Sequence, residues 1–139
     1  MYLLDTNTCI HFLNGSSKSV AVQMRLRPPS EIVLCSIVKA ELLYGARHSE
    51  RVEDNLRLLD RFFTPLASLS FDDRCAEEYG LIRAQLAAQG ALIGPNDLMI
   101  AATARAHDTT LVTHNIREFN RVAGLRLTDW IEEPGPSIE

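Results

Sequence analysis

Residues 1–13 read MYLLDTNTCIHFL and place an acidic side chain directly after a short apolar run. The run Tyr2–Leu4 has the length and composition of a buried strand, whereas Thr6 and Asn7 are residues that suit the start of a helix. Asp5 therefore follows a predicted strand at its carboxyl end. Its structural explanation is a helix N-cap, and its functional explanation is a ligand at the edge of a sheet.

The rest of the chain repeats this alternation of short apolar runs with amphipathic segments. We expect further strands at Ile32–Cys35, Ala67–Leu69, Thr110–Thr113 and Leu125–Thr128. Helices are predicted near residues 6–14, 18–27, 37–48, 51–63, 72–89 and 95–107. Strands separated by helices of this length predict a three-layer α/β/α domain with a central, mostly parallel sheet of about five short strands. The pattern does not predict the strand order.

Length and composition fit a single domain. The chain has 139 residues, 46% of them hydrophobic, with a formal net charge of −4. We expect one domain over residues 1–132 and a disordered C-terminal tail over residues 133–139, where Pro and Gly are frequent. No apolar run approaches the roughly 20 residues of a membrane span, and the N-terminus lacks a basic leader. Three cysteines without Cys-x-x-Cys spacing indicate free thiols and a cytoplasmic protein.

Glu41 is a carboxylate in an apolar setting. On a helix that begins near Ile37, its neighbours one turn away are Ile37, Val38, Tyr44 and Gly45, which we interpret as an apolar stripe. A buried carboxylate costs free energy unless it is paired or binds a metal ion. The alternative is a residue at the edge of the stripe that reaches solvent.

Asp97 repeats this arrangement. Gly94 and Pro95 are typical of a helix start, and the positions that share a face with Asp97 are apolar, namely Ile100, Ala101 and Ala104. The helix dipole favours an ionised carboxylate in the first turn, which would suit a metal ligand. The alternative is an Asp that only stabilises its own helix.

Asn115 and Glu118 follow the predicted strand Thr110–Thr113 and so lie beyond the carboxyl end of that strand. Asn115 could simply cap a short helix that contains Glu118. Together with Asp5, Glu41 and Asp97, however, these residues predict a cluster of oxygen ligands at one sheet edge. Mg²⁺ and Mn²⁺ prefer such ligands, and the repulsion between clustered carboxylates would raise at least one pKa.

The histidines do not predict a second centre. His11, His48, His107 and His114 lack metal-ligand spacing and do not lie beside a Ser or Cys in a nucleophile motif.

Four stretches resemble the PIN-domain ribonucleases, and among them the VapC toxins of bacterial toxin–antitoxin pairs. They are LLDTNTCIHFL (3–13), SIVKAELLYGA (36–46), GPNDLMIAATARAHDTTLVTHN (94–115) and IREFNRVAGLRLTDW (116–130). An Asp-Thr-Asn after a strand is weak alone, whereas the complete ordered set covers nearly the whole chain and is highly specific.

The resemblance implies that Asp5, Glu41 and Asp97 are catalytic acids that bind Mg²⁺, for which Mn²⁺ can substitute. The family often has a fourth acid at the position that Asn115 occupies here. Glu118 could restore that acid from three positions later, so we include it among the catalytic candidates. The departure at Asn115 leaves the occupancy of a second metal site open.

Two hydroxyl groups, those of Thr6 and Thr113, resemble the polar groups with which the family positions a water or a carboxylate. The implied reaction is endonucleolytic hydrolysis of an RNA phosphodiester to 5′-phosphate and 3′-hydroxyl ends. Asp5 and Asp97 would hold the ion, with Glu41 as a further ligand or as the group that orients the attacking water. Similar relatives cut structured RNA, including the anticodon stem-loop of initiator tRNA, so tRNA is the leading substrate candidate.

Basic side chains should guide RNA towards this acidic pocket, although each is individually better explained as part of a solvated face. The candidates are Lys39, Arg47, Arg83, Arg105, Arg117 and Arg121.

The resemblance also implies a cognate VapB antitoxin, a homodimer and a larger toxin–antitoxin assembly. An antitoxin segment would lie in an apolar groove on the early helices, although most of these side chains could equally be core. The groove candidates are Ile10, Phe12, Leu13, Leu56, Leu59, Phe62 and Phe63.

Two other functions are compatible with the residues. A PIN-like module could bind RNA or protein without cutting, as the departure at Asn115 allows. Another Mg²⁺-dependent phosphodiesterase, a DNA nuclease or a phosphatase could share the sheet. Phosphatases with a nucleophilic Asp generally need a second Asp two positions later, where this chain has Asn7, which counts against them.

Overall fold

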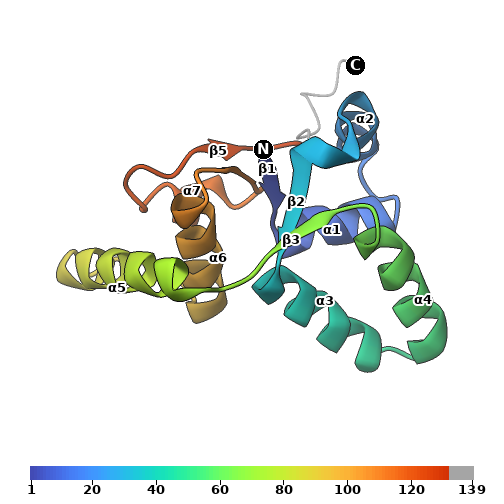
Figure 1. Cartoon of the computed structure of the whole chain (residues 1–139), viewed down its shortest axis with the longest axis horizontal. Helices are drawn as coiled ribbons and strands as arrows, with labels where there is room; N and C mark the ends of the chain where they lie inside the picture. The colour runs from blue at the N-terminus through green and yellow to red at the C-terminus, as the bar shows by residue number, and fades with distance from the viewer. Residues whose placement is uncertain (132–139) are drawn as a thin grey trace, which may run out of the picture.

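The computed structural model describes residues 1–131, which form one sheet with helices on both sides (Figure 1). The sheet has five strands in the order β3-β2-β1-β4-β5, and every neighbouring pair is parallel. The predicted three-layer α/β/α class is therefore confirmed. The predicted tail at 133–139, and residue 132 before it, lie outside the described residues, so that boundary stays a prediction.

The strands agree closely with the predicted ones. They are β1 (Tyr2–Leu4), β2 (Ile32–Cys35), β3 (Ala67–Leu69), β4 (Thr110–Val112) and β5 (Leu127–Thr128). The last two are shorter than predicted. Thr113 turns away from β4 although its N–H donates to the carbonyl of Thr128, and β5 begins only at Leu127.

The helices lie where the apolar periodicity predicts them, within one residue at most ends. They are α1 (Thr6–Leu13), α2 (Lys18–Leu26), α3 (Ser36–Arg47), α4 (Val52–Phe63), α5 (Asp73–Ala88), α6 (Pro95–Ala106) and α7 (Ile116–Phe119). A 3₁₀ turn, η1 (Pro29–Glu31), leads into β2. None of the helices among residues 1–131 combines the length and hydropathy that a membrane span needs.

The path of the chain divides the helices into two groups. Helices α1 to α4 follow β1 and β2, and they lie on one side of the sheet, opposite α5, α6 and α7 (Figure 1). The chain adds β2 and then β3 on one side of β1, and afterwards returns to add β4 and β5 on the other side. The strand order thus reverses between β1 and β4, and ligands of open parallel sheets bind at such a point, beyond the carboxyl ends of the strands.

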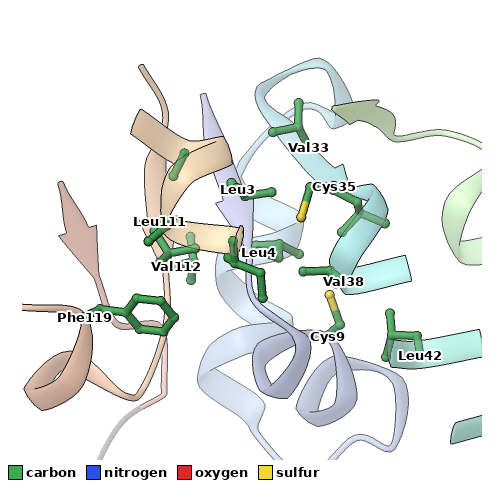
Figure 2. Packing of buried hydrophobic residues seen from close by; sticks show 14 of the residues in the cluster. Leu3, Leu4, Cys9, Val33, Cys35, Val38, Leu42, Leu111, Val112 and Phe119 are labelled. Carbon is green, nitrogen blue, oxygen red and sulfur yellow. The ribbon is translucent and has the colours of Figure 1, made fainter. Parts of the chain in front are cut away.

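The central strands are buried on both faces. Leu3, Leu4, Val33, Leu111 and Val112 are at most 1% exposed and pack against the helices on either side (Figure 2). Full burial of one such side chain contributes about 1.5–3 kcal/mol to stability. This rigid centre fixes the positions of the residues that follow β1 and β4.

The three cysteines are free thiols, as predicted, and all three are buried. Cys9 and Cys35 belong to the packed centre (Figure 2).

Candidate functional site

Asp5 and Thr113 lie side by side at the carboxyl edge of the sheet. Each follows the last residue of its strand, and β1 and β4 are neighbours with Leu4 paired to Val112. The Asp5 N–H donates to the carbonyl of Val112 at 3.0 Å. The point of strand reversal therefore carries an acid from one strand and a hydroxyl from the next.

Asp5 serves as the N-cap of α1, so its structural explanation is correct. Its Oδ1 accepts from the N–H of Thr8 at 2.9 Å, which is the usual N-cap bond. The side chain is nevertheless only 6% exposed, and burial raises its pKa above the ordinary value, with Asp129 adding to the rise. Hydrogen bonds from Thr113 and Thr8 act in the opposite direction and favour the carboxylate. The Asp5 side chain therefore caps α1 and also belongs to the acidic site.

Glu41 lies on the second turn of α3 and is half-buried. Its Oε1 accepts from the hydroxyl of Thr6 at 2.7 Å, which joins α3 to the start of α1. The predicted apolar stripe around it is wrong in part, because Tyr44 is 69% exposed and Gly45 is exposed too. The face of α3 that packs into the core is formed by Val38, Leu42 and Ala46. Glu41 therefore borders the core and opens onto solvent.

Asp97 occupies the first turn of α6, which begins at Pro95 as predicted. This helix leads into β4 and runs against the strands, so its N-terminus lies at their carboxyl edge. Its predicted apolar face is confirmed, since Ile100, Ala101 and Ala104 are all at most 1% exposed. Helices α3 and α6 contact each other, which brings the segment that carries Asp97 near Glu41.

The pKa of Asp97 is the clearest sign that the acids lie together. Partial burial and the charges of Glu41, Glu118 and Asp5, in that order, raise it from 3.8 to about 6. Water and salt screen charges that lie far apart, so one carboxylate raises the pKa of another mainly when the two are close together or partly buried. Four acids from separate parts of the chain thus share one electrostatic environment.

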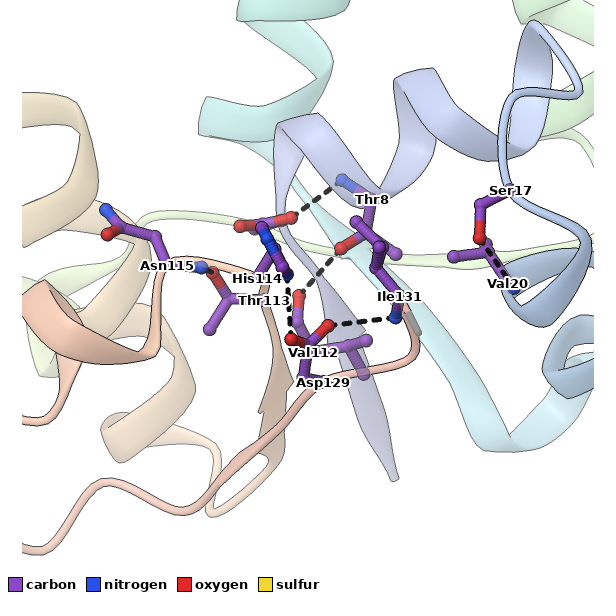
Figure 3. Close-up of polar contacts among 10 residues, drawn as sticks. Thr8, Ser17, Val20, Val112, Thr113, His114, Asn115, Asp129 and Ile131 are labelled. Atoms are coloured by element: carbon purple, nitrogen blue, oxygen red, sulfur yellow. Dashed lines mark hydrogen bonds and ion pairs between the residues drawn. The ribbon is translucent and has the colours of Figure 1, made fainter. Parts of the chain in front are cut away.

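Asn115 and Glu118 join this environment through α7. The Asn115 side-chain amide donates to Glu118 Oε2 at 3.0 Å. Its backbone N–H donates to Thr113 Oγ1 at 3.0 Å (Figure 3). Asn115 occupies the N-cap position of α7, but its side chain makes no capping bond, so the cap explanation is wrong. Its amide instead holds Glu118.

Asp129, just after β5, is an acid that the sequence analysis missed. It lies near enough to Asp5 for its charge to raise the pKa of Asp5, and its Oδ2 lies 2.8 Å from His114 Nδ1 (Figure 3). Its own strand has only two residues, Leu127 and Thr128, which weakened the signal. The signal that could have identified Asp129 is the one that identifies Asp5, namely an acid that directly follows a strand.

Glu41 of the acidic cluster lines a cleft of about 580 Å³. Its lining combines polar and apolar side chains from α1, α3 and α6, namely Thr6, Asn7, Ile10, Ile37, Ala40, Glu41, Tyr44, Asn96 and Met99. The cluster is looser than a closed metal site. Among residues 1–131, the one group of three His, Cys, Asp or Glu side chains with all ligand atoms within 4.8 Å is Asp72, Cys75 and His107, on other elements.

The basic candidates differ in whether their side chains already contact other groups of the protein. Arg105 pairs with Glu78 at 2.7 Å, and the Lys39 ammonium lies 4.8 Å from the centre of the Phe63 ring. Arg83 donates to the Tyr79 hydroxyl at 2.8 Å, and Arg121 donates to a backbone carbonyl. Arg47 and Arg117 are exposed, which suits them better to a mobile phosphate backbone.

An apolar groove of about 410 Å³ runs between α1, α3 and α4. It is lined by Ile10, Leu13, Asn14, Glu41, Leu42, Gly45, Ala46, Asn55, Leu58 and Leu59. Of the predicted groove residues, Ile10, Leu13 and Leu59 take part. Phe12 and Phe62, whose rings pack together 5.6 Å apart, line a different pocket, and Leu56 and Phe63 pack against the core without lining the groove, so the contact of these four with an antitoxin stays a prediction.

Comparisons with known proteins give one consistent result. The PIN domain family matches residues 2–125. Ribonuclease VapC2 of Rickettsia felis is 40% identical over 131 residues, which span 94% of this chain and 98% of the relative. The tRNA(fMet)-specific endonuclease VapC of Shigella flexneri is 40% identical over 129 residues, spanning 93% and 97% respectively. The crystal structure of VapBC2 from Rickettsia felis bound to a DNA fragment from their promoter has a TM-score of 0.87 at 40% identity, covering 93% of this chain and 98% of that one.

Proposed function

The chain belongs to the VapC ribonucleases of the PIN-domain family, and on that premise we propose that Asp5, Glu41 and Asp97 form its catalytic centre. It is the toxin of a toxin–antitoxin pair, a ribonuclease that hydrolyses RNA phosphodiester bonds. One observation carries the assignment of the centre, namely that Asp5, Glu41 and Glu118, from separate elements, lie close enough to Asp97 for their charges to help raise its pKa to about 6. An Asp that only stabilised the first turn of its own helix would not need three other acids beside it.

The proposed cofactor is Mg²⁺, with Mn²⁺ able to substitute. The donors at the cluster are oxygens: the carboxylates of Asp5, Glu41 and Asp97, with Glu118 beside them. Such a set suits a hard cation that keeps several of its waters, which is consistent with acids that do not close into a tight cage. When bound, the ion would neutralise negative charge on the phosphate and make a nearby water easier to deprotonate.

The neighbouring hydroxyl and amide groups orient these carboxylates. Thr8 and Thr113 fix Asp5, and Thr6 holds one oxygen of Glu41, which leaves its second oxygen free to orient the attacking water. Asn115 holds Glu118 in the same way. In the proposed reaction, the water oxygen attacks phosphorus in line and the bond to the 3′ oxygen breaks, giving 5′-phosphate and 3′-hydroxyl ends.

We propose a tRNA as the substrate, with the initiator tRNA first. The Shigella flexneri relative, named for tRNA(fMet), shares 40% of its residues with this chain over 93% of the length. The mixed lining of the cleft at Thr6, Asn7, Tyr44 and Asn96 offers hydrogen-bonding groups and one exposed aromatic ring, on which a base could stack.

A VapB antitoxin is the proposed partner in the groove between α1, α3 and α4, in a cytoplasmic complex that also contains a toxin homodimer. The groove presents apolar side chains such as Leu13, Leu58 and Leu59, which suit one face of an amphipathic segment. Glu41 lines both this groove and the cleft of the acid cluster, so a segment that fills the groove would reach the catalytic centre.

Mapping new RNA 5′ ends after brief expression of the chain tests this function. We expect new 5′-phosphate ends concentrated in one loop of a tRNA, and none from the Asp97→Asn variant. Asp54→Asn is a matched control, because Asp54 has the same first-turn position on α4 but is exposed and lies outside the cluster. No new ends from the wild type would exclude the proposed tRNA cleavage, and the same ends from Asp97→Asn would exclude Asp97 from the catalytic centre.

A further inference from the structure

A second group of metal-ligating side chains lies at the junction of α5 and α6. Asp72 is the N-cap of α5, Cys75 lies on the first turn of that helix, and His107 ends α6. One ligand atom from each, a carboxylate oxygen, the Cys75 Sγ and a ring nitrogen of His107, all lie within 4.8 Å of one another. The cysteine and the histidine are 32 residues apart in the chain, so no spacing motif predicts their approach.

The backbone holds two of these groups in place. Asp72 Oδ1 accepts from the N–H of Cys75 at 3.1 Å, which caps the helix and leaves Oδ2 available. The Cys75 side chain is fully buried, with its Sγ 3.6 Å from the carbonyl oxygen of Ser70. Arg74 donates to the carbonyl of Ala106, which ties the start of α5 to the end of α6. These bonds hold the two helix ends and the side chains of Asp72 and Cys75 together in the metal-free chain.

His107 supplies an independent indication of a ligand. Its Nε2 is buried and has no hydrogen-bond partner, one of two such side-chain atoms among residues 1–131. A buried polar atom without a partner costs about 1–3 kcal/mol. Helix capping explains the position of Asp72, and core packing explains the burial of the Cys75 thiol. Neither explains why His107 Nε2 is buried without a hydrogen-bond partner.

We propose that Asp72, Cys75 and His107 bind Zn²⁺ or a similar transition-metal ion, at a site separate from the carboxylate centre. Sulfur and imidazole ligands select such ions over Mg²⁺, which prefers oxygen. On binding, the Cys75 thiol releases its proton to solvent and the sulfur coordinates the metal as a thiolate. Asp72 is exposed, so water can reach the site and supply the fourth ligand of a tetrahedral ion.

The geometry requires only a small contraction. Ligand atoms around a tetrahedral Zn²⁺ lie about 3.3–3.7 Å apart, given its usual bond lengths. The ligand atoms now lie within 4.8 Å of one another. Rotation of the Asp72 and His107 side chains that moves these atoms by about an ångström would bring them to the separation that Zn²⁺ requires. Burial raises the pKa of Cys75 in the metal-free chain, and a bound cation would lower it again. The ion would clamp α5 against α6.

Titration of the reduced full chain with Co²⁺ tests this site, because thiolate ligation gives a charge-transfer absorption that oxygen ligands do not. We expect this absorption in the wild type, its loss in Cys75→Ser, and its retention in Cys9→Ala and Cys35→Ala. No absorption in the wild type, or unchanged absorption in Cys75→Ser, would overturn the proposal.

Competition by Zn²⁺ then tests the other two ligands. We expect Asp72→Asn and His107→Gln to weaken Zn²⁺ binding by about tenfold or more, and His48→Gln to leave it unchanged. Asn is itself a good N-cap, so Asp72→Asn keeps α5 folded, which far-ultraviolet circular dichroism without metal would check. Binding that depends on Cys75 but is unchanged in both of these variants would mean a thiol binding metal alone and would refute the three-ligand site.

Discussion

Asp5, Glu41 and Glu118 each accept a hydrogen bond from a neighbour that the fold places beside them, and Glu41 is the simplest case. Its Oε1 lies 2.7 Å from the Thr6 hydroxyl, which belongs to the first residue of α1. Replacing Thr6 with Val keeps the shape of the side chain and removes this donor. We expect RNA cleavage by Thr6→Val to slow by about tenfold, because positioning groups around a metal site contribute that much. Thr6→Ser should stay close to wild type, and a wild-type rate for Thr6→Val would show that Glu41 needs no such support.

The raised pKa of Asp97 gives a prediction with a definite sign. Between its ordinary value of 3.8 and about 6, the folded metal-free chain keeps a proton on Asp97 that the unfolded chain releases. The free energy of unfolding should therefore fall as pH rises through this interval, and Asp5, whose pKa is also raised, acts in the same direction. Mg²⁺ should restore stability at neutral pH.

Thermal unfolding in EDTA between about pH 4 and pH 7 measures this effect. The fall in melting temperature should be smaller in Asp97→Asn and unchanged in Asp54→Asn, whose carboxylate is exposed and beside Arg57. A melting temperature that rises equally over this range in the wild type and Asp97→Asn would contradict the shared environment of the acids.

At the scale of elements, α1, α3 and α4 form the groove, and α1 and α3 also contribute to the cleft. The two functions can be tested separately, because Leu58 lines the groove but not the cleft. We expect Leu58→Glu to weaken binding of the cognate antitoxin by about tenfold or more, since it places a charge in an apolar interface, and to leave RNA cleavage unchanged.

Isothermal titration with the antitoxin and a cleavage assay would measure both effects. Leu81→Glu is the matched control, because Leu81 is an exposed leucine on α5, which does not line the groove. Equal antitoxin affinity for Leu58→Glu and Leu81→Glu would place the antitoxin elsewhere.

Elements with a strong local signal were predictable from the sequence. The helix α6 has Gly94 and Pro95 at its start and several buried alanines, so its start and the burial of its predicted apolar face were predicted correctly, and its end lies one residue before the predicted one. The short elements were harder. The two-residue strand β5 owes its existence to pairing with β4, which is a tertiary contact and leaves little trace in the local pattern.

At the scale of the whole molecule, the sequence predicted that Asp5, Glu41 and Asp97 would meet but not how. A carboxylate after a strand is visible locally, and the parallel sheet then gathers such residues at one edge. The strand reversal between β1 and β4 depends on the global path of the chain, and so do the approach of Asp129 to Asp5 and of Cys75 to His107. Residues far apart in sequence reveal such encounters only in the folded chain.

The dependence of tRNA cleavage on Mg²⁺ concentration is the most direct test of the carboxylate centre, measured for the wild type and for Asp5→Asn. Asn keeps the N-cap bond to Thr8 but removes the negative charge, so the fold is retained while the centre loses a ligand. We predict saturable, EDTA-sensitive cleavage by the wild type. For Asp5→Asn we predict a cleavage rate that is lower by about a hundredfold or more at every Mg²⁺ concentration. Cleavage by Asp5→Asn at the wild-type rate in saturating Mg²⁺, or wild-type cleavage that persists in EDTA, would contradict the account.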